Sequence, residues 1–313
     1  MDKVNQTLAT EFILLGLSAI PEVEDFLFII FLLIYVITLA GNILIITIIH
    51  LDTHLHTAMY YFISNLSFLD ICSSTVTVPK LLADLRAEKK TISFPSCMIQ
   101  LYFFASLVSI ECLLLAAMAY DRYIAICHPL HYSSIMDQSA CSWLAASLWV
   151  GGHIYSSVHV ILMSKLSFCR SNIIQHFFCD IPPLLSLSCS STFINILLIL
   201  TLGGLLGFGS ILTKIVSYAF IISTILNIKS SVGRAKTFST CASHLTVVII
   251  FYGTLLFIYY PPTTTNSFSV NRFVSVVYSI LTPMVNPMIY SLRNTEMKKA
   301  VKKAFGRIQR MIK

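Results

Sequence analysis

Seven long apolar runs constrain this chain more than any other feature of its sequence. Each run has the roughly 20 residues that an α-helix needs to cross a hydrocarbon layer of about 30 Å. None alternates between apolar and polar residues, as a strand of a membrane barrel does. The runs extend over Phe26 to Ile49, Met59 to Leu82, Ser96 to Tyr120, Cys141 to Met163, Phe193 to Leu226, Phe238 to Tyr260 and Phe273 to Leu292.

The composition indicates that lipid surrounds these runs. Hydrophobic residues make up 56% of the 313 residues and charged residues only 11%, which is too apolar for a soluble surface. We therefore predict an all-α membrane protein. Its seven-transmembrane helix bundle covers residues 1–292, which include an extracellular tail, 1–25. A cytoplasmic tail, 293–313, follows the bundle. In the fifth run Phe193 to Thr213 spans the membrane by itself, so we expect the helix to enter the cytosol from Lys214 onward.

Basic residues predict the orientation of the bundle. Most lysines and arginines, including the lysine-rich segment after Arg293, lie inside the cell when the N-terminus lies outside. Asn5 begins a glycosylation sequon on the exposed tail. The apolar stretch Phe12 to Ile20 is too short, and its flanks too acidic, for a removable signal peptide. The net charge of +7 then indicates contact with the membrane surface and protein partners, and not with nucleic acid.

An amphipathic helix is predicted after the seventh run. Apolar residues recur there at three- and four-residue spacing among lysines and arginines, which favours a helix lying on the inner leaflet of the membrane. Its apolar residues are Met297, Val301, Phe305, Ile308 and Ile312.

Four of the nine cysteines map to the oxidising side of the membrane, namely Cys97, Cys169, Cys179 and Cys189. They can form two bridges in three pairings, and their spacing does not choose among these. The sequence contains neither the Cys-x-x-Cys spacing of a zinc site nor the His-Glu-x-x-His motif of a metalloprotease. We therefore predict no metal centre and no enzyme.

Two carboxylic acids, Asp70 and Glu111, lie near the middle of their spans, where an ionisable group costs several kcal/mol. If they face one another they cannot both remain bare anions, so they share a proton or bind a cation such as sodium. Asn42, Asn65 and Asn286 could complete one polar network with them. Such a network is either a switch or a structural pair. A transporter would use the same carboxylates, but we find no inverted repeat.

Two further motifs lie at the inner ends of spans. Asp121-Arg122-Tyr123 closes the third span, where it is either an interfacial ion pair or part of a switch. Asn286-Pro287 precedes Tyr290 at the end of the seventh, where proline removes a helical hydrogen bond and loosens the helix.

Together these segments resemble the odorant-receptor branch of the rhodopsin-like G-protein-coupled receptors over nearly the whole chain. The segments that carry the resemblance are Gly41-Asn42, Leu55 to Asp70 (LHTAMYYFISNLSFLD), Met118 to Tyr132 (MAYDRYIAICHPLHY), His176 to Asp180 (HFFCD), Ser217-Tyr218, Lys236 to Leu245 (KTFSTCASHL) and Pro283 to Asn294 (PMVNPMIYSLRN). Ala58, Tyr61 and Thr237 depart from the family pattern, but they leave the signalling residues in place.

The resemblance implies a receptor for volatile odorants that acts through the stimulatory olfactory G protein to raise cyclic AMP in the cilia of olfactory neurons. It implies the bridges Cys97 to Cys179 and Cys169 to Cys189. It also implies that Arg122 leaves Asp121 on activation and meets the G protein. Arg122 would there meet Tyr218 and Tyr290 as well, and the inner end of the sixth helix, Lys236 to His244, would swing outward to admit the G protein.

The odorant site is expected in the outer half of the bundle. Helical spacing from Cys97 places Phe104, Ala105, Val108 and Ser109 on one inward face. The opposite wall is predicted to contain Leu202, Leu206, Tyr252, Leu255, Leu256, Tyr259, Val276 and Ser279. Plain helix packing is the alternative role of each residue.

These walls carry no charge, which predicts a small, neutral, mostly apolar ligand of roughly micromolar affinity. A hydroxyl of Ser109, Ser279 or Tyr259 would orient it. Apart from sodium, no cofactor is expected.

Overall fold

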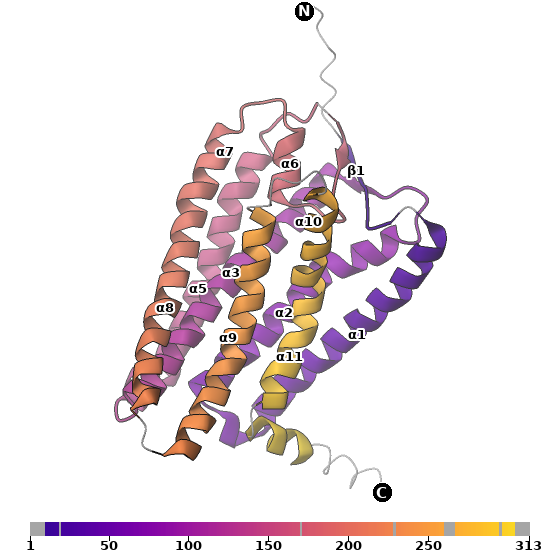
Figure 1. Ribbon diagram of the computed structural model, residues 1–313. Coiled ribbons are helices and arrows are strands. Elements are labelled where there is room, and N and C mark those ends of the chain that lie inside the picture. Colours follow the sequence, from indigo (N-terminus) through magenta and orange to yellow (C-terminus); the bar gives the residue numbers. More distant parts are fainter. Residues whose placement is uncertain are drawn as a thin grey trace, which may run out of the picture.

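The chain folds into a bundle of long helices (Figure 1). The computed structural model describes residues 10–18, 20–169, 171–227, 230–259, 267–293 and 296–303. In these residues the seven rods are α1 (Pro21–Leu51), α2 (Ala58–Asp84), α3 (Phe94–Cys127), α5 (Gln138–Met163), α7 (Phe193–Leu198) with η2 (Ile199–Gly203) and α8 (Gly204–Leu226), α9 (Ser231–Tyr259), and α10 (Ser267–Val276) with η3 (Val277–Leu281) and α11 (Thr282–Arg293). The predicted seven-helix fold is confirmed.

Shorter helices join the rods: η1 (Thr53–Leu55) and α4 (Tyr132–Ile135) at one end of the bundle, and α6 (Ile181–Leu187) at the other. Local sequence fixes where rods begin. Pro21 lies in the first turn of α1, where the missing N–H of a proline costs nothing. Asp137 caps α5, because its Oδ1 accepts from the N–H of Ala140 at 2.7 Å.

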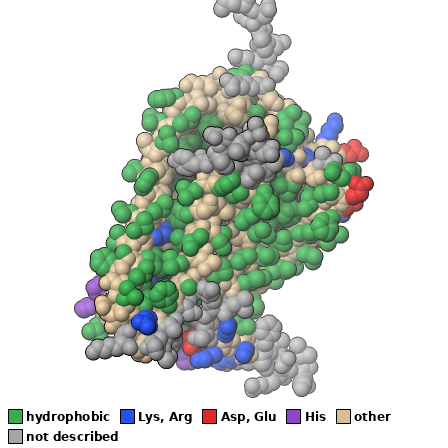
Figure 2. Space-filling view, in the orientation of Figure 1, with side chains coloured by type: hydrophobic (Ala, Val, Ile, Leu, Met, Phe, Trp, Pro, Cys, Tyr) green, Lys and Arg blue, Asp and Glu red, His purple; other side chains and the backbone are tan. Residues whose placement is uncertain are grey.

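The rods present apolar side chains to their surroundings. Phe26 on α1 and Phe208 on α8 are 63% and 79% exposed, and Figure 2 shows one face of the bundle covered largely by hydrophobic groups. Five of the described helices are long and apolar enough to cross a membrane, and α9 contains a shorter apolar stretch, His244–Phe257. An apolar surface this extensive needs lipid and not water around it.

Helix α3 lies at the centre of the bundle and contacts α2, α5, α8 and α9. Its close approach to α5 depends on Gly152, since a Cβ atom there would clash with Ile110 and lie 3.0 Å from the carbonyl oxygen of Ser106. We call the end of the bundle that carries Cys97 the disulfide end, and the opposite end the Arg122 end.

Part of the predicted extracellular tail, residues 1–25, packs on the bundle. Glu11–Leu14 forms strand β1, which pairs antiparallel with β2 (Thr91–Ser93) and parallel with β3 (Ile173–Ile174). Phe12 and Leu14 are buried, while their neighbours point outward. The start of the apolar stretch Phe12 to Ile20 therefore closes the core at the disulfide end.

We expect from the sequence that the fifth helix enters the cytosol from Lys214 onward. The structure instead places Lys214 inside the bundle. Its side chain is 4% exposed inside the bundle. Beyond it, Ile215 and Phe220 still face outward at 61% and 55% exposure, so the lipid-facing surface continues along α8.

Candidate functional site

Two disulfides fold a long loop over the disulfide end. Cys97 in the first turn of α3 bridges Cys179, with their Cα atoms 5.6 Å apart. Cys169 bridges Cys189 at 5.8 Å and encloses β3 and α6. The backbone N–H of Cys179 also donates to Gln100 Oε1 at 2.9 Å, which fixes the loop on α3. The structure thus contains both pairings that the family resemblance implies.

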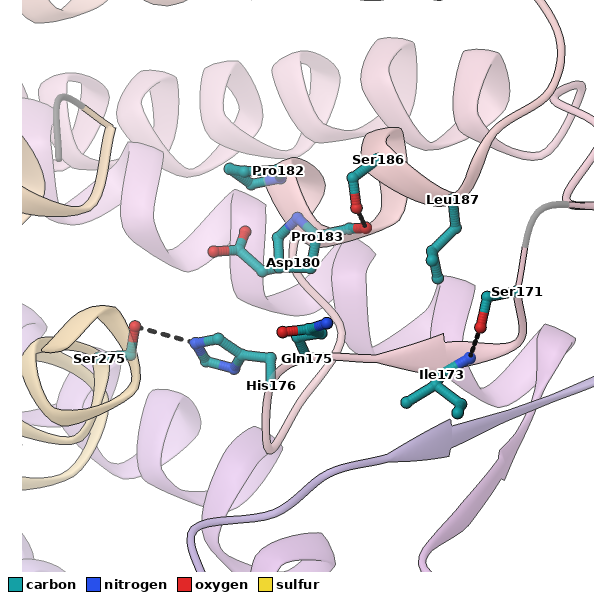
Figure 3. Close-up of a pocket in the computed structure, with 10 residues that line it drawn as sticks. All are labelled: Ser171, Ile173, Gln175, His176, Asp180, Pro182, Pro183, Ser186, Leu187 and Ser275. Carbon is teal, nitrogen blue, oxygen red and sulfur yellow. Dashed lines mark hydrogen bonds between the residues drawn. The ribbon is translucent and has the colours of Figure 1, made fainter. Parts of the chain in front are cut away.

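A cavity of about 340 Å³ lies between this loop and α10 (Figure 3). A hydrogen bond of 3.0 Å between His176 Nε2 and Ser275 Oγ crosses from the loop to α10. Asp180 accepts from the N–H of Ile181 at 2.7 Å. The cavity is lined by Ser171, Ile173, Gln175, His176, Asp180, Pro182, Pro183, Ser186, Leu187 and Ser275. It is a partly polar vestibule above the predicted odorant site.

Two ionisable groups line this vestibule and are held neutral over overlapping ranges of pH. Burial raises the pKa of Asp180 to about 6, although its hydrogen bond from Ile181 opposes the shift. Burial, with a smaller contribution from Arg272, lowers the pKa of His176 to about 3. The stability of the closed loop therefore changes with pH through two groups whose pKa shifts act in opposite directions.

An aromatic series leads from the vestibule into the bundle. Ring centroids are 4.5 Å apart between Phe178 and Phe104, and 6.1 Å between Phe104 and Tyr278. They are 5.7 Å apart between Tyr278 and Phe251, and 5.1 Å between Phe251 and Tyr252. Contacts of this length connect the bridged loop with α3, η3 and α9.

Five predicted wall residues belong to, or pack against, the core cluster that contains this series. Phe104, Ala105, Ser109 and Ser279 are buried. The partly buried members, which pack against the core cluster around Phe104 and Phe251, are Val108, Tyr252, Leu255 and Val276. Leu202 in η2 and Leu206 in α8 are half-buried.

The prediction for Leu256 is wrong, and that for Tyr259 lies outside what is described. Leu256 is 56% exposed and faces away from the core, because its neighbour Leu255 takes the inward position on α9. The side chain of Tyr259 falls outside the described residues. None of the described predicted wall residues lines the vestibule, and sequence reasoning had not selected Phe178, Tyr278 or Phe251.

The predicted orienting hydroxyls bond within their own helices. Ser109 Oγ donates to the carbonyl oxygen of Ala105 at 2.8 Å, and Ser279 Oγ donates to that of Ser275 at 2.7 Å. Each serine can still accept a hydrogen bond from a ligand, because a hydroxyl oxygen has two lone pairs. Ser279 lies in η3, one of two π-helical segments in the described rods, and such segments are frequent at functional sites.

A polar network crosses the middle of the bundle. Asn286 Nδ2 in α11 donates to both carboxylate oxygens of Asp70, at 3.1 and 3.2 Å. Asn42 Nδ2 in α1 donates to the carbonyl oxygen of Pro283 at 3.0 Å. Glu111 is buried and close enough to Asp70 for an electrostatic interaction. Among the described residues, Glu111 Oε1 and Asn42 Oδ1 have no hydrogen-bond partner.

Asn65 does not join this network, contrary to the sequence prediction. Its Oδ1 accepts from the indole N–H of Trp149 at 3.2 Å, and its Nδ2 donates to the carbonyl oxygen of Tyr61 at 2.9 Å. Asn65 therefore joins α2 to α5 and not to the carboxylates.

At the Arg122 end, Asp121 is buried between two partners. Arg122 Nε lies 3.9 Å from Asp121 Oδ2, and the hydroxyl of Tyr132 donates to Asp121 Oδ1 at 2.8 Å. Tyr123 contacts His128 at 3.0 Å between the hydroxyl and Nε2. This geometry fits an arginine that is retained by its neighbouring acid.

His244 holds the inner part of α9 against two other helices. Its Nε2 lies 3.1 Å from the carbonyl oxygen of Leu115 in α3, and its Nδ1 lies 2.6 Å from the hydroxyl of Tyr218 in α8. Because a carbonyl only accepts, Nε2 carries the proton of the neutral ring, and Nδ1 accepts from Tyr218. Lys236 also lies on α9, but its side chain is outside the described residues.

Pro287 and Tyr290 lie on α11, as the sequence places them. Pro287 packs close to Gly41, where an added Cβ would meet the proline ring at 3.6 Å. The hydroxyl of Tyr290 is buried and has no hydrogen-bond partner among the described residues, so it can take a new one if the helices move.

The described part of the C-terminal segment has the predicted amphipathic pattern. Residues 296–303 are helical, with Met297 and Ala300 buried. Lys303 Nζ bonds to Asp52 Oδ2 at 3.1 Å, and this bond lowers the pKa of Asp52. The predicted residues Phe305, Ile308 and Ile312 lie outside the described residues, as does Asn5.

Comparison with known proteins agrees with these features. The sequence pattern of the olfactory receptor family matches residues 31–307. Olfactory receptor 5AR1 of Mus musculus is 47% identical and covers 98% of this chain and 99% of that receptor. Olfactory receptor 1G1 of Gorilla gorilla gorilla is 50% identical, with 97% of both chains covered.

The fold also has a solved counterpart. The crystal structure of squid rhodopsin superposes with a TM-score of 0.66 at 17% identity, covering 93% of this chain and 87% of that one. The chain therefore belongs to the olfactory receptor family: it is a multi-pass membrane receptor for odorants that couples to a G protein, and it is not an enzyme.

Proposed function

We propose that this receptor binds a small, neutral, mostly apolar volatile in the outer half of its bundle and activates the stimulatory olfactory G protein, raising cyclic AMP. The observation that carries the ligand class is the aromatic series from Phe178 to Tyr252, whose five side chains are apolar or phenolic and carry no carboxylate. Such walls favour apolar ligands, with a serine hydroxyl to orient an oxygen atom.

The vestibule supports a route of entry. It lies where His176 meets Ser275, and Ser279 follows one turn further along the same rod. An odorant that passes the His176 contact reaches Phe178 and Phe104 next. We expect weak, roughly micromolar binding, because the walls have few polar anchors.

The test is a cyclic-AMP assay in cells that supply the olfactory G protein, screened against a broad odorant panel. The wild-type receptor should respond to some neutral volatiles, and Ser109→Ala should weaken responses to oxygenated ones. Arg122→Ala, expressed at the same surface level, should abolish every response. A response that survives this change would refute the coupling route through Arg122.

We also propose that the Arg122 end faces the cytosol in the plasma membrane of olfactory cilia. Support comes from the exposed lysines of residues 296–303, which suit the anionic inner leaflet. The N-terminus would then lie outside and carry a glycan at Asn5. A glycosidase should shift the mobility of the wild-type receptor but not of Asn5→Gln, and an unshifted wild type would contradict the glycan.

Sodium is the one ion that we propose for the polar network. The unpartnered Glu111 Oε1 and the neighbouring Asp70 carboxylate supply the oxygen ligands that a hard cation prefers. Replacing sodium chloride with choline chloride should then change odorant potency in the wild type but not in Glu111→Gln. Equal potency in both salts would favour a shared proton instead.

A further inference from the structure

Lys214 is a buried ionisable side chain that has no role in the proposed odorant site or in G-protein coupling. It lies on α8 with 4% of its surface exposed, and it forms no ion pair with a carboxylate in the described parts of the chain. An ammonium group in the interior of a membrane bundle costs several kcal/mol unless oxygen atoms replace its water. Its surroundings therefore decide what it does.

The Lys214 ammonium joins three helices. Nζ donates to the carbonyl oxygen of Cys112 in α3 at 3.2 Å, to Ser210 Oγ in its own helix, and to the hydroxyl of Tyr252 in α9 at 2.8 Å. These three acceptors satisfy the three donors of an ammonium group. Nζ also lies 4.7 Å from the centroid of the Tyr252 ring, within the range of a cation–π contact.

Tyr252 gives this arrangement a connection to the ligand site. It ends the aromatic series, since its ring lies 5.1 Å from that of Phe251. Its hydroxyl further contacts Ser210 Oγ and lies 3.1 Å from Cys112 Sγ. A ligand that displaces Tyr252 therefore removes one acceptor of Lys214.

Helix α9, which carries Tyr252, also carries His244 closer to the Arg122 end. His244 contacts Leu115 in α3 and Tyr218 in α8, the same two helices that Lys214 joins to α9 through Cys112 and Tyr252. Two sets of hydrogen bonds thus hold α9 in the arrangement seen here. The set around Lys214 is the one that lies next to the aromatic series.

We propose that Lys214 is a positioning residue: an ammonium clamp that keeps α9 packed on α3 and α8 until a ligand shifts Tyr252. The proposal rests on the proposed odorant site for its trigger, but not for the clamp itself. Loss of the Tyr252 acceptor weakens the resting arrangement, because hydrogen bonds to a charged group contribute more than neutral ones.

The first test uses the full-length receptor without ligand. Lys214→Met keeps a long side chain and removes the charge, so basal cyclic AMP per surface receptor should rise about tenfold. Tyr252→Phe removes one acceptor and should raise the basal signal in the same direction. Because both changes break one contact, the double variant should show much less than the product of the two effects.

Thr213→Val is the matched control. Thr213 is the neighbouring residue on α8, is exposed, and donates only to the carbonyl oxygen of Gly209 in its own helix at 2.8 Å. Its basal signal should equal that of the wild type. If Lys214→Met does not reach the surface, Ser210→Ala and Tyr252→Phe carry the test, and an unchanged basal signal in both overturns the clamp.

A second measurement separates the clamp from the choice of G protein. Spin-labelled amino acids at Gln138 on α5 and Phe238 on α9, both exposed near the Arg122 end, report the position of α9 in purified receptor in nanodiscs. Lys214→Met should lengthen this distance without ligand. A wild-type distance refutes the clamp. A longer distance without a cyclic-AMP signal supports the clamp and refutes the proposed coupling.

Discussion

The vestibule gives a pH dependence whose sign and size follow from two residues. Opening the loop around His176 and Asp180 returns each group to water, where their pKa values take the ordinary 6.5 and 3.8. In the closed loop, burial lowers the pKa of His176 to about 3 and raises that of Asp180 to about 6. Each change of pKa therefore becomes a pH-dependent free energy of loop opening.

The two contributions have opposite signs. Below pH 6.5 the open loop binds a proton at His176 that the closed loop does not, so the closed form loses about 2 kcal/mol between pH 6.5 and pH 5. Below pH 6 the closed loop binds a proton at Asp180 that the open loop does not, and it gains about 1.4 kcal/mol by pH 5. In the wild type these effects nearly cancel.

Asp180→Asn removes only the compensating titration and keeps an oxygen that can accept from the N–H of Ile181. Its loop should therefore open more easily at pH 5 than at pH 7, by about 2 kcal/mol. His176→Gln should show the reverse trend, with a more stable loop at pH 5. Amide hydrogen exchange of residues 174–184, corrected for the intrinsic pH dependence of exchange, measures the free energy of opening. Equal changes of the opening free energy with pH in the wild type and in Asp180→Asn would refute the opposing titrations.

Three matched comparisons test other parts of the structure. Leu255→Ala should raise the half-maximal odorant concentration by about tenfold or more, because the free energy lost with buried apolar contacts is large enough for such a shift. Leu256→Ala on the outer face should not change this concentration. Equal shifts in both variants would contradict the orientation of α9. Gly152→Ala should destabilise the α3–α5 contact by about 1–3 kcal/mol and lower the melting temperature, while Gly151→Ala, with open space around its Cβ, should not lower it, because alanine favours a helix more than glycine does. Cys169→Ser with Cys189→Ser removes the disulfide that joins residues 20 positions apart and should cost about 3 kcal/mol of loop stability. The loss should appear as faster amide exchange in α6. Unchanged exchange would show that packing alone holds the loop.

Run length and hydropathy were sufficient to predict the seven rods, because lipid requires every spanning helix to be long and apolar. The local motifs placed Arg122 and Asp121 at one end of α3 and the cysteines at the other. These features follow from residues close together in the sequence. Contacts between distant segments were harder to foresee.

Lys214 shows why. A charge at the end of a long apolar run normally marks the membrane surface, but here oxygen acceptors from α3 and α9 meet it inside the bundle. No pattern within the fifth run reveals those acceptors. Asn65 is a similar case, since its partner Trp149 lies on α5, more than 80 residues away in the sequence.

Helical register accounts for the remaining differences. The π-helical segments η2 and η3 each insert a wider turn, which shifts the face that later residues present. On α9, Leu255 and Leu256 are adjacent apolar residues, and only packing against Phe251 and its neighbours distinguishes the inward one. The strand β1 escaped prediction because its partners, β2 and β3, come from distant loops.

An odorant bound among the aromatic rings should drive α9 away from α3 at the Arg122 end. The most direct measurement is the distance between labels at Gln138 and Phe238 in nanodiscs, with and without an odorant that raises cyclic AMP in cells. We predict a longer distance when that odorant is bound, and no further lengthening by it in Lys214→Met. An activating odorant that leaves the wild-type distance unchanged would contradict the account.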